Sequence, residues 1–524
     1  MKKNSSKEHV LAVDAGTGSC RAVIFDRDGR QISFSQREWS HRPARGYPGS
    51  SVFDTKSNWS LISLCIRDSI VKSAVESSSI KAVSTTSMRE GIVLYDESGK
   101  EIWACPNIDS RAREEAEELV KSGEAEKIYF ISGDWVSITS APRFNWIRKH
   151  QPHIFRRIAH MSMLSDWILY RLSGEFVTEP SIGSSSGMFD LKKRTWSPRI
   201  IELCNLDREV FPRVYPSGTV VGSVTKKAAI ETHLDEGTPV VVGGADTQLG
   251  LTGIGVANPG QVTILGGSFW QTTILSNKPV VDPDIRLRTI CGAVPGQWML
   301  EGIGFYCGWS LRWFRDAFCQ AEKEEARKLG IDPYELMERQ ASSVPAGSSG
   351  VIGIFSNLMN SKKWIHASPS FLQFDISNPT QSGKKECIRA IEEAAAYVSL
   401  GHLRIIQSIT NSEPEELTFA GGGAKSFLWP QILSDVLGLR VKIPEIKESS
   451  ALGAAICAGV GAGFYESLRE GAAGLVKIER SFEPRPKIHK EYSKLYDNWL
   501  KIYDENLRIS ETGLLNPLWR AAGT

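Results

Sequence analysis

The sequence predicts an α/β protein built from more than one structural unit. With 524 residues the chain is long enough for about three to four units, because a domain typically takes roughly 100–200 residues. Short apolar runs of strand length alternate with segments of helical periodicity, which is the pattern of an α/β fold. A strand–turn–strand pattern near the N-terminus also returns near the middle of the chain.

Composition and charge exclude several classes of function. Hydrophobic residues make up 41% of the chain and charged residues 23%, as in ordinary globular proteins. The 62 basic and 60 acidic residues leave a net charge of +2. Neither a nucleic acid nor an anionic membrane is therefore expected as a partner.

The cysteines and the N-terminus indicate a cytoplasmic protein. The nine cysteines are odd in number and none forms a C-x-x-C pair, which fits a reducing compartment better than a disulfide framework. The first residues, "MKKNSSKEHV", lack the apolar core of a signal peptide. Residues 451–464 are the most apolar late stretch, but they are short and rich in glycine, which indicates a packed helix and not a membrane span.

The predicted elements follow in order along the chain. Residues 11–14 form a strand that ends on Asp14, a Gly-Thr-Gly-Ser turn follows, and a second strand ends at Phe25. Residues 26–29 are a hairpin turn into a third strand. Further strands are expected at 83–87, 239–243 and 417–420, and helices at 110–121, 141–150, 386–409 and 492–507.

The repeated pattern predicts two similar domains. Residues 262–275, "VTILGGSFWQTTIL", repeat the strand, small-residue turn and strand of "LAVDAGTGSCRAVIF". Aligning the two turns places Leu265 opposite Asp14, so only the first hairpin carries an acid. Two related domains that face each other explain the repeat, although short hairpins also resemble each other by chance. The boundary is expected between residues 249 and 259, which gives domains of residues 1–255 and 256–524.

Two acids stand directly after buried strands. The turn of small residues after Asp14 exposes backbone N–H groups that suit a phosphate, and a carboxylate beside it indicates Mg²⁺ between the two. The alternative is that Asp14 caps the turn. Asp246 follows the apolar strand and two glycines of "VVVGGADTQLG". That position suits a general base, the N-cap of the next helix, or both.

Two further segments have more than one interpretation. Residues 419–426, "FAGGGAKS", form a glycine-rich turn after a strand, where a nucleotide can bind, but they lack the spacing of a P-loop. Close packing of a helix on the strand explains such a turn equally well. Arg89 and Glu90 stand just past a strand. They can donate to one hydroxyl of a polyol and accept from the next, or form a surface ion pair.

The order of these motifs resembles the FGGY family of carbohydrate kinases over essentially the whole chain. The matching segments include "DAGTGSCRAVIFD", "SDWILYRLSGE", "GGADTQLGLTGIGV", "FAGGGAKSFLWPQILSDVLG" and "ESSALGAAICAGVGAG". The segments "SMREGIVLYDESGKEIWACPNIDSRA", "GGSFWQ" and "IFSNLMNSKKWIHASPSF" resemble one subfamily. The Pro-Tyr-Leu…Gly-Glu-Arg signature of many sugar kinases in the family is missing, which argues against a generic xylulokinase or glycerol kinase.

The resemblance implies two actin-like, ribonuclease-H-like domains with ATP and the substrate in the cleft between them. Asp14, together with Asp246, would hold Mg²⁺ at the phosphates of ATP. Phosphate contacts in the first hairpin would be Gly16, Thr17 and Ser19, and the second hairpin would close on the same phosphates. The residues implied to face the nucleotide from the other domain are Gly267, Ser268, Gly308, Gly421, Gly422 and Gly423.

The resemblance also implies a substrate site. Asp246 matches the catalytic base of the family, with Arg89 and Glu90 against the substrate and Gln248, Phe269 and Trp270 as further expected contacts. The subfamily segments imply phosphorylation of a primary hydroxyl on a short open-chain molecule. Two alternatives stay open: a kinase of another small sugar or polyol, such as a pentulose or glycerol, and a non-catalytic nucleotide switch on an actin-like fold.

Overall fold

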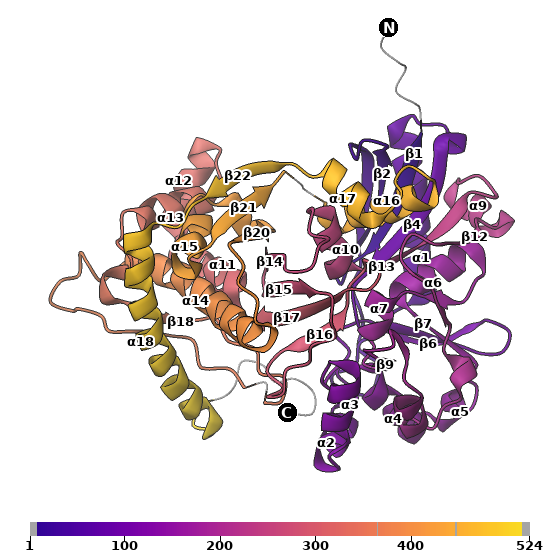
Figure 1. Ribbon diagram of the computed structural model, residues 1–524, viewed down its shortest axis with the longest axis horizontal. Coiled ribbons are helices and arrows are strands. Elements are labelled where there is room, and N and C mark those ends of the chain that lie inside the picture. Colours follow the sequence, from indigo (N-terminus) through magenta and orange to yellow (C-terminus); the bar gives the residue numbers. More distant parts are fainter. Residues whose placement is uncertain (1–7, 364, 446–447, 516–524) are drawn as a thin grey trace, which may run out of the picture.

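Two large mixed β-sheets, one from each half of the chain, form the framework of the protein. The computed structural model describes residues 8–363, 365–445 and 448–515. In Figure 1 the N-terminal half, in indigo and magenta, lies to the right, and most of the C-terminal half, in orange and yellow, lies to the left. The prediction of an α/β fold with two similar domains is confirmed in its architecture.

The first sheet has the strand order β12-β13-β4-β1-β2-β3. The strands β1, β4 and β13 are parallel neighbours, whereas β2, β3 and β12 run antiparallel to the strands beside them. Their bounds are β1 (His9–Ala15), β2 (Ser19–Asp26), β3 (Gln31–Glu38), β4 (Ile80–Ser87), β12 (Val220–Ser223) and β13 (Pro239–Ala245).

Strand β1 is apolar from Val10 to Val13 because both faces of the first sheet are covered. Leu11 and Val13 belong to the core under the helices α1 (Thr55–Ser73) and α6 (Leu164–Ser173). Val10 and Ala12 point the other way, into a core shared with α16 (Ser449–Gly461). Burial on both faces removes the polar alternation of a half-exposed strand.

The second sheet repeats the first in strand position and direction. Its order is β16-β17-β15-β14-β20-β21-β22. Strand β14 is antiparallel to β15 and parallel to β20, as β1 is antiparallel to β2 and parallel to β4. The bounds are β14 (Val262–Gly266), β15 (Trp270–Ser276), β16 (Arg288–Cys291), β17 (Trp298–Gly304), β20 (Glu416–Ala420), β21 (Arg440–Pro444) and β22 (Ile478–Phe482). The hairpin repeat seen in the sequence is therefore a repeat of the whole sheet.

The chain returns to the first sheet near its C-terminus. Helices α16 and α17 (Leu468–Leu475) lie beside β1, β2 and β4 in Figure 1, and α16 packs on that sheet. There α16 crosses α10 (Asp246–Gly253), and a Cβ on Gly453 would lie 1.9 Å from the backbone oxygen of Leu249. The division into residues 1–255 and 256–524 stays a prediction.

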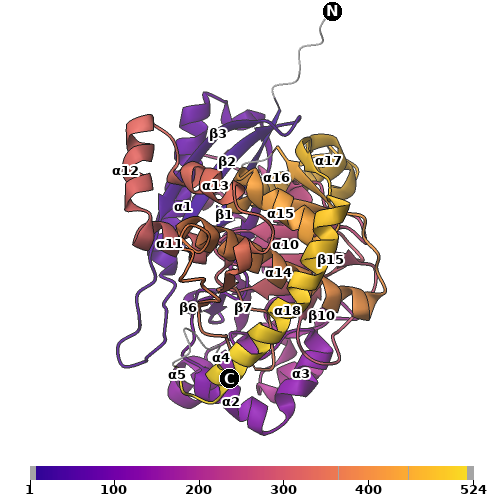
Figure 2. The same cartoon turned by 90° about the vertical axis from the view of Figure 1, so that its left-hand side faces the viewer.

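The expected helices are present with shifted ends. The predicted segments correspond to α2 (Arg113–Lys121), α4 (Ser140–His150), α14 (Lys384–Thr410) and α18 (Pro486–Glu511). Figure 2 shows α18 running across the outside of the C-terminal half, over α14. Tyr492, Tyr496, Trp499 and Tyr503 form its buried face. No helix of the described ranges is long and apolar enough to cross a membrane.

Smaller elements complete the fold. A three-stranded sheet contains β5 (Ile92–Tyr95), β6 (Glu101–Cys105) and β7 (His160–Met163). Three strand pairs are β8 (Val177–Thr178) with β11 (Arg213–Val214), β9 (Phe189–Asp190) with β10 (Thr195–Trp196), and β18 (Ile352–Ile354) with β19 (Ser370–Leu372). The remaining helices are α3 (Glu124–Ser132), α5 (Pro152–Phe155), α7 (Pro180–Ser184), α8 (Pro198–Leu203), α9 (Lys226–Thr232), α11 (Cys307–Phe318), α12 (Gln320–Leu329), α13 (Pro333–Ser342) and α15 (Leu428–Leu437).

Candidate active site

Three parallel strands bring the predicted N-terminal site residues to one edge of the first sheet. Asp14 lies near the end of β1, Arg89 and Glu90 come after β4, and Asp246 follows β13. Because β1, β4 and β13 are parallel neighbours, their carboxyl ends lie together. Ligands in open α/β sheets bind outside the carboxyl ends of the strands. The residues thus gather where this topology expects a ligand.

Asp246 begins helix α10 and is only partly exposed. The N-cap is Ala245, so the N-cap alternative for Asp246 is wrong, although its Oδ1 accepts a hydrogen bond of 2.7 Å from the backbone N–H of Thr247. Burial raises the pKa of Asp246 to about 6, against the lowering effect of Arg89, and Glu90 adds to the rise. A carboxylate whose pKa lies nearer neutrality is a better proton acceptor.

The Asp14 side chain is buried, with 6% of the residue exposed. Burial raises its pKa to about 7, against the effect of Arg21, while Asp246 and Glu448 raise it further. Arg21 Nε lies 3.6 Å from the Asp14 carboxylate and the same guanidinium also pairs with Glu448. In the described ranges, no N–H of the following turn donates to Asp14, so the structure does not support the turn-cap alternative. The metal role stays a prediction.

The first hairpin presents backbone N–H groups beside Asp14. The carbonyl oxygens of Gly16 and Thr17 accept a hydrogen bond from the indole of Trp39, and the backbone N–H of Trp39 donates to Gly18. The carbonyl oxygens of Gly16, Thr17 and Gly18 thus all accept hydrogen bonds from Trp39. The N–H groups of Thr17 and Gly18 have no acceptor in the part of the chain that the structure describes. Free amides at a small-residue turn suit an anion such as phosphate.

Five of the predicted nucleotide residues line one pocket of about 480 Å³ in the C-terminal half. There α11 begins against the second hairpin, and the N–H groups of Gly308 and Trp309 donate to the backbone oxygen of Ser268. A Cβ on Gly308 would lie 2.2 Å from the oxygen of Gly267, so this contact requires glycine. Gly421 directly precedes the pocket at the end of β20. The five residues are Gly267, Ser268, Gly308, Gly422 and Gly423.

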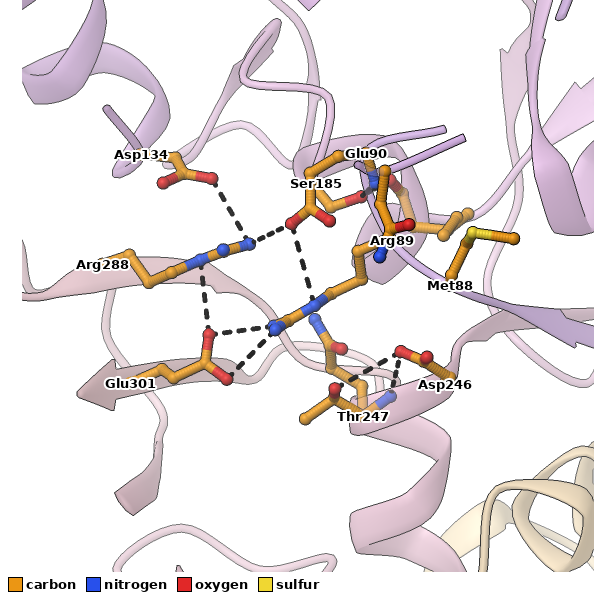
Figure 3. A network of polar contacts seen from close by, with 12 residues as sticks. Met88, Arg89, Glu90, Asp134, Ser185, Asp246, Thr247, Arg288 and Glu301 are labelled. Atoms are coloured by element: carbon orange, nitrogen blue, oxygen red, sulfur yellow. Dashed lines mark hydrogen bonds and ion pairs between the residues drawn. The ribbon is translucent and has the colours of Figure 1, made fainter. Parts of the chain in front are cut away.

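Arg89 and Glu90 belong to a buried network of charges that joins the two halves of the chain (Figure 3). Arg89 forms a two-pronged ion pair with Glu301 on β17, with N–O distances of 2.9 and 3.2 Å. Arg288 on β16 donates to Glu90 at 2.8 Å, and its guanidinium also lies 3.3 Å from Asp134 and 3.3 Å from Glu301. All five are buried, so the surface ion-pair alternative is wrong.

The network holds more carboxyl groups than guanidinium groups. Two guanidinium groups face three carboxylates, and Asp246 lies beside them in Figure 3. Although burial opposes it, the attraction of Arg89 and Arg288 holds the pKa of Glu301 below its usual value. Glu90 has a left-handed backbone with φ of 62°, and its backbone oxygen accepts from Arg143. Strained backbone of this kind persists where the surroundings determine it, and such positions cluster at functional sites.

Three members of this network were missed in the sequence. Asp134, Arg288 and Glu301 come from a loop and two strands that are far from Arg89 in the chain. The signal that could have found Glu301 is an acid inside the otherwise apolar strand "WMLEGIG". Nothing in the sequence around Asp134 points to the site.

The three weaker substrate predictions have different surroundings. Gln248 is buried and its amide donates to the backbone oxygen of Cys291 at 3.3 Å. Phe269 is 40% exposed at the tip of the second hairpin and packs on Phe305. Trp270 is 1% exposed and packs in the core with its ring tilted against Trp429, under the pocket of about 480 Å³. The side chain of Trp270 therefore does not join Arg89 and Glu90, because alternation along β15 turns it into the core.

The fold and the site define an actin-like protein of two similar domains, with charged residues between them. Models of the N-terminal and C-terminal domains of the FGGY family of carbohydrate kinases match residues 9–253 and 264–462. The chain belongs to this family, so it is a carbohydrate kinase, and kinases of this family use ATP with a small substrate.

Relatives match the chain along its whole length. The autoinducer-2 kinase of Yersinia enterocolitica is 44% identical over 99% of this chain and 98% of its own. The autoinducer-2 kinase of Photorhabdus laumondii is 43% identical over the same shares. Among solved structures, xylulose kinase from Rhodospirillum rubrum matches with a TM-score of 0.85 at 24% identity, covering 96% of this chain and 100% of that one. At that identity the solved structure supports the fold alone.

Proposed function

We propose that this kinase phosphorylates the primary hydroxyl of autoinducer-2, the open-chain dihydroxypentanedione that serves as a quorum-sensing signal, in the cytoplasm. The observation that carries the proposal is identity of 43–44% over nearly the whole length to proteins named autoinducer-2 kinases. The segments around Arg89, "SMREG", and around Trp270, "GGSFWQ", also resemble that subfamily.

The charged network supports a small, oxygen-rich substrate. Guanidinium groups only donate hydrogen bonds and ionised carboxylates only accept them. Arg89 and Arg288 can donate to carbonyl oxygens, while Glu90 can accept from a neighbouring hydroxyl. A short chain with adjacent carbonyl and hydroxyl oxygens needs this alternation of donors and acceptors. A site of this kind rejects analogues that lack one of the oxygens, because its buried groups are then left unpaired.

Asp246 is the proposed catalytic base. Its carboxylate would orient the primary hydroxyl and accept its proton as the oxygen attacks the γ-phosphorus of ATP. Catalysis of phosphoryl transfer depends mainly on positioning and on stabilising charge. The amides of the first hairpin and the turn at Gly267 and Ser268 are the proposed phosphate contacts, one from each half of the chain.

The residues at the strand ends fit Mg²⁺. Magnesium in kinases is usually held by one or two carboxylates together with phosphate oxygens and water. Asp14 and Asp246 supply two carboxylates whose pKa values are raised by burial, and each would gain a counter-charge from the ion. The described residues contain no group of three or more His, Cys, Asp or Glu that could hold a metal by itself, so the ion is expected to arrive with ATP. When bound, it would neutralise charge on the transferring phosphoryl group.

Release of ADP over a panel of acceptors tests the proposal. Dihydroxypentanedione is expected to exceed xylulose, ribulose and glycerol in kcat/KM by at least roughly 10²-fold, a cautious part of the range for hydrogen-bonding sites. If kcat/KM for xylulose or glycerol equals that for the dione, the substrate is another sugar or polyol, and only the assignment to the kinase family stands. If no acceptor raises ADP release above its basal rate, a nucleotide switch is the better interpretation.

A matched pair of variants links the preference to the network. E90Q should lower kcat/KM for the dione by about tenfold or more, because a buried acceptor is replaced by a mixed donor and acceptor. E97Q makes the same change at an exposed position of the β5–β6 turn and should leave kcat/KM unchanged. Equal effects of the two variants would contradict a role for Glu90 in binding.

A further inference from the structure

We propose that Glu392 reads the edge of the nucleotide base that carries the 6-amino group, and so makes this kinase select adenine nucleotides. Glu392 lies on α14 at the wall of the pocket of about 480 Å³ that Gly267, Gly308 and Gly423 also line. The inference rests on the proposed function, because it takes this pocket as the ATP site.

One oxygen of the Glu392 carboxyl group is buried without a hydrogen-bond partner among the described residues. Only 3% of the residue is exposed, and its Oε2 has no hydrogen-bond partner in the part of the chain that the structure describes. The neighbouring wall of the pocket includes the apolar side chains of Leu311, Met337 and Trp429. An apolar wall with one unpaired polar group is the usual composition of a site that packs an aromatic ligand and fixes its orientation.

The other acids near the pocket are already engaged or exposed. Glu338 accepts hydrogen bonds from the backbone of Phe427 and from the hydroxyl of Ser426. Glu393, the next residue on α14, pairs with Arg389 at 2.9 Å and accepts from Tyr492. The pocket acids Asp332 and Glu335 lie at the exposed rim. Glu392 is therefore the acid of this pocket whose buried oxygen still requires a ligand.

Burial without a partner is costly for the free protein. A buried polar group that lacks a hydrogen bond destabilises the folded state, and an apolar residue of similar size would fill the same position better. Such a group is retained at a binding site when the ligand supplies the missing partner. The unpaired oxygen of Glu392 thus lowers the stability of the free protein, and its missing hydrogen bond forms only when nucleotide is bound.

The chemistry of a carboxylic acid matches the adenine edge. Burial raises the pKa of Glu392 to about 8, against the effect of Arg389, and Glu338 and Glu393 raise it further, so the group is mainly protonated at neutral pH. A protonated carboxyl accepts a hydrogen bond through its carbonyl oxygen and donates one through its hydroxyl. Adenine offers the matching pair, a 6-amino donor next to a ring-nitrogen acceptor.

Calorimetric titration with three nucleotides tests the proposal without a turnover assay. The probes are ADP, the diphosphate of purine riboside, which lacks the 6-amino group, and GDP. The proteins are the wild type, E392L, E392Q and E335L, which makes the same apolar change on the exposed rim of the same pocket. E392A serves as a second apolar variant if E392L does not fold.

Wild type and E335L should bind ADP about tenfold more tightly than the analogue without the amino group, which is the usual effect of one hydrogen bond in a buried site. E392L should bind the two equally. E392Q should keep most of the difference, because its amide offers the same donor and acceptor pair as the protonated acid. The melting temperature of E392L should equal or exceed that of the wild type, since an unpaired buried acid has been removed.

Two results would overturn the proposal. One is an equal loss of affinity in the wild type and in E392L when the 6-amino group is removed from the nucleotide. Glu392 would then not contact that edge of the base. The other is tighter binding of GDP than of ADP by the wild type. If the wild type binds none of the three nucleotides, the assignment of the pocket as the ATP site has failed instead.

Discussion

The ionisation of single carboxyl groups in this protein depends on their surroundings more than on their residue type. Asp14 and Asp246 are both aspartates at strand ends, yet burial raises their pKa values to about 7 and about 6. Glu301 is also buried, but two arginines hold its pKa below the usual value. The first two can therefore exchange protons or cations near neutral pH, whereas Glu301 stays ionised and holds Arg89 and Arg288 in position.

The first prediction at this scale concerns Asp246. D246N should lower kcat by about 10²–10⁴, the usual effect of losing a general base, while the Kd for ADP stays within about twofold because the change is nearly isosteric. Steady-state kinetics and calorimetry measure the two values. D284N, a surface change far from α10 in the sequence, is the control and should keep wild-type kcat. Turnover of D246N near the wild-type rate would remove Asp246 from the mechanism.

The second prediction is the pH dependence of the wild type. Asp246 accepts a proton only when it is ionised, so kcat/KM should fall as the pH drops through the raised pKa of about 6. An ordinary aspartate would lose activity only near pH 4. A profile of kcat/KM between pH 4.5 and 8, with the coupling enzymes in excess, shows which applies. A flat profile down to pH about 5 would contradict the raised pKa of the base.

The third prediction concerns Asp14 and links metal to stability. D14N should raise the Mg²⁺ concentration for half-maximal activity by about tenfold or more, because Mg²⁺ prefers charged oxygen ligands. In the free protein the raised pKa means that the folded state holds the Asp14 proton more tightly than the unfolded state. The wild type therefore loses stability as the pH rises toward 7 and Asp14 becomes charged, whereas D14N does not. In the absence of Mg²⁺ and nucleotide, the melting temperature of D14N at pH 8 should be higher than that of the wild type.

The exposed Asp28 offers the matched control. D28N, in the turn between β2 and β3, should change neither the Mg²⁺ requirement nor the melting temperature. An unchanged Mg²⁺ titration of D14N would show that Asp14 does not act through the ion.

At the scale of elements, the crossing of α10 and α16 positions the proposed catalytic base, Asp246, which directly follows β13. Asp246 is the first residue of α10, and the hydroxyl of Ser450 on α16 donates to its backbone oxygen at 3.0 Å. Gly253 and Gly453 let the two helix backbones touch, since a Cβ on either would lie about 2 Å from backbone oxygen of the other helix. The packing of these two helices therefore determines the position of Asp246 at the start of α10.

The fourth prediction follows from that contact. G453A should force α16 away from α10, lowering the free energy of unfolding by about 1–3 kcal/mol, as overpacked cores do, and lowering kcat through Asp246. G474A makes the same change in α17, where no described atom beyond the adjoining turns of that helix lies within 4 Å of the new Cβ, and helix propensity should stabilise it by up to about 1 kcal/mol. Chemical denaturation of both variants gives the comparison, and equal stabilities would contradict the tight crossing.

At the scale of the whole molecule, the components of the proposed reaction are divided between the two halves. Asp14 and the first hairpin belong to the first sheet and Asp246 directly follows its strand β13, whereas the proposed nucleotide pocket lies at the second sheet. The pair between Arg89 and Glu301 already bridges the halves. Phosphoryl transfer needs the acceptor hydroxyl and the γ-phosphate in contact, with water excluded, and closure of two domains commonly achieves both.

The fifth prediction is that nucleotide and acceptor together close the molecule. Small-angle scattering of the wild type with dihydroxypentanedione and a non-hydrolysable ATP analogue should give a smaller radius of gyration than either ligand alone. D246N with dihydroxypentanedione and ATP itself should give the same compaction, since the nearly isosteric change is expected to slow turnover far more than it weakens binding. An unchanged radius in both experiments would mean that the halves are already closed in the free protein.

Local patterns in the sequence were sufficient for the main elements and for half of the site. The apolar runs and turn residues predicted β1, β2, β4, β13 and β20, because strand periodicity and glycine-rich turns act over a few residues. The two strand-end acids were visible for the same reason. The repeat of one hairpin also indicated a second domain, and the structure extends that repeat to the strand order of both sheets.

What the sequence by itself determined was the α/β class, the paired hairpins and the acids at the strand ends. Only the tertiary structure decided which side chains share an environment: it turned Trp270 into the core, joined Arg89 to Glu301, and left Glu392 unpaired in the pocket wall. The physical reason is that strand and turn preferences are local, whereas burial and charge pairing depend on residues more than two hundred positions apart, as Arg89 and Glu301 are.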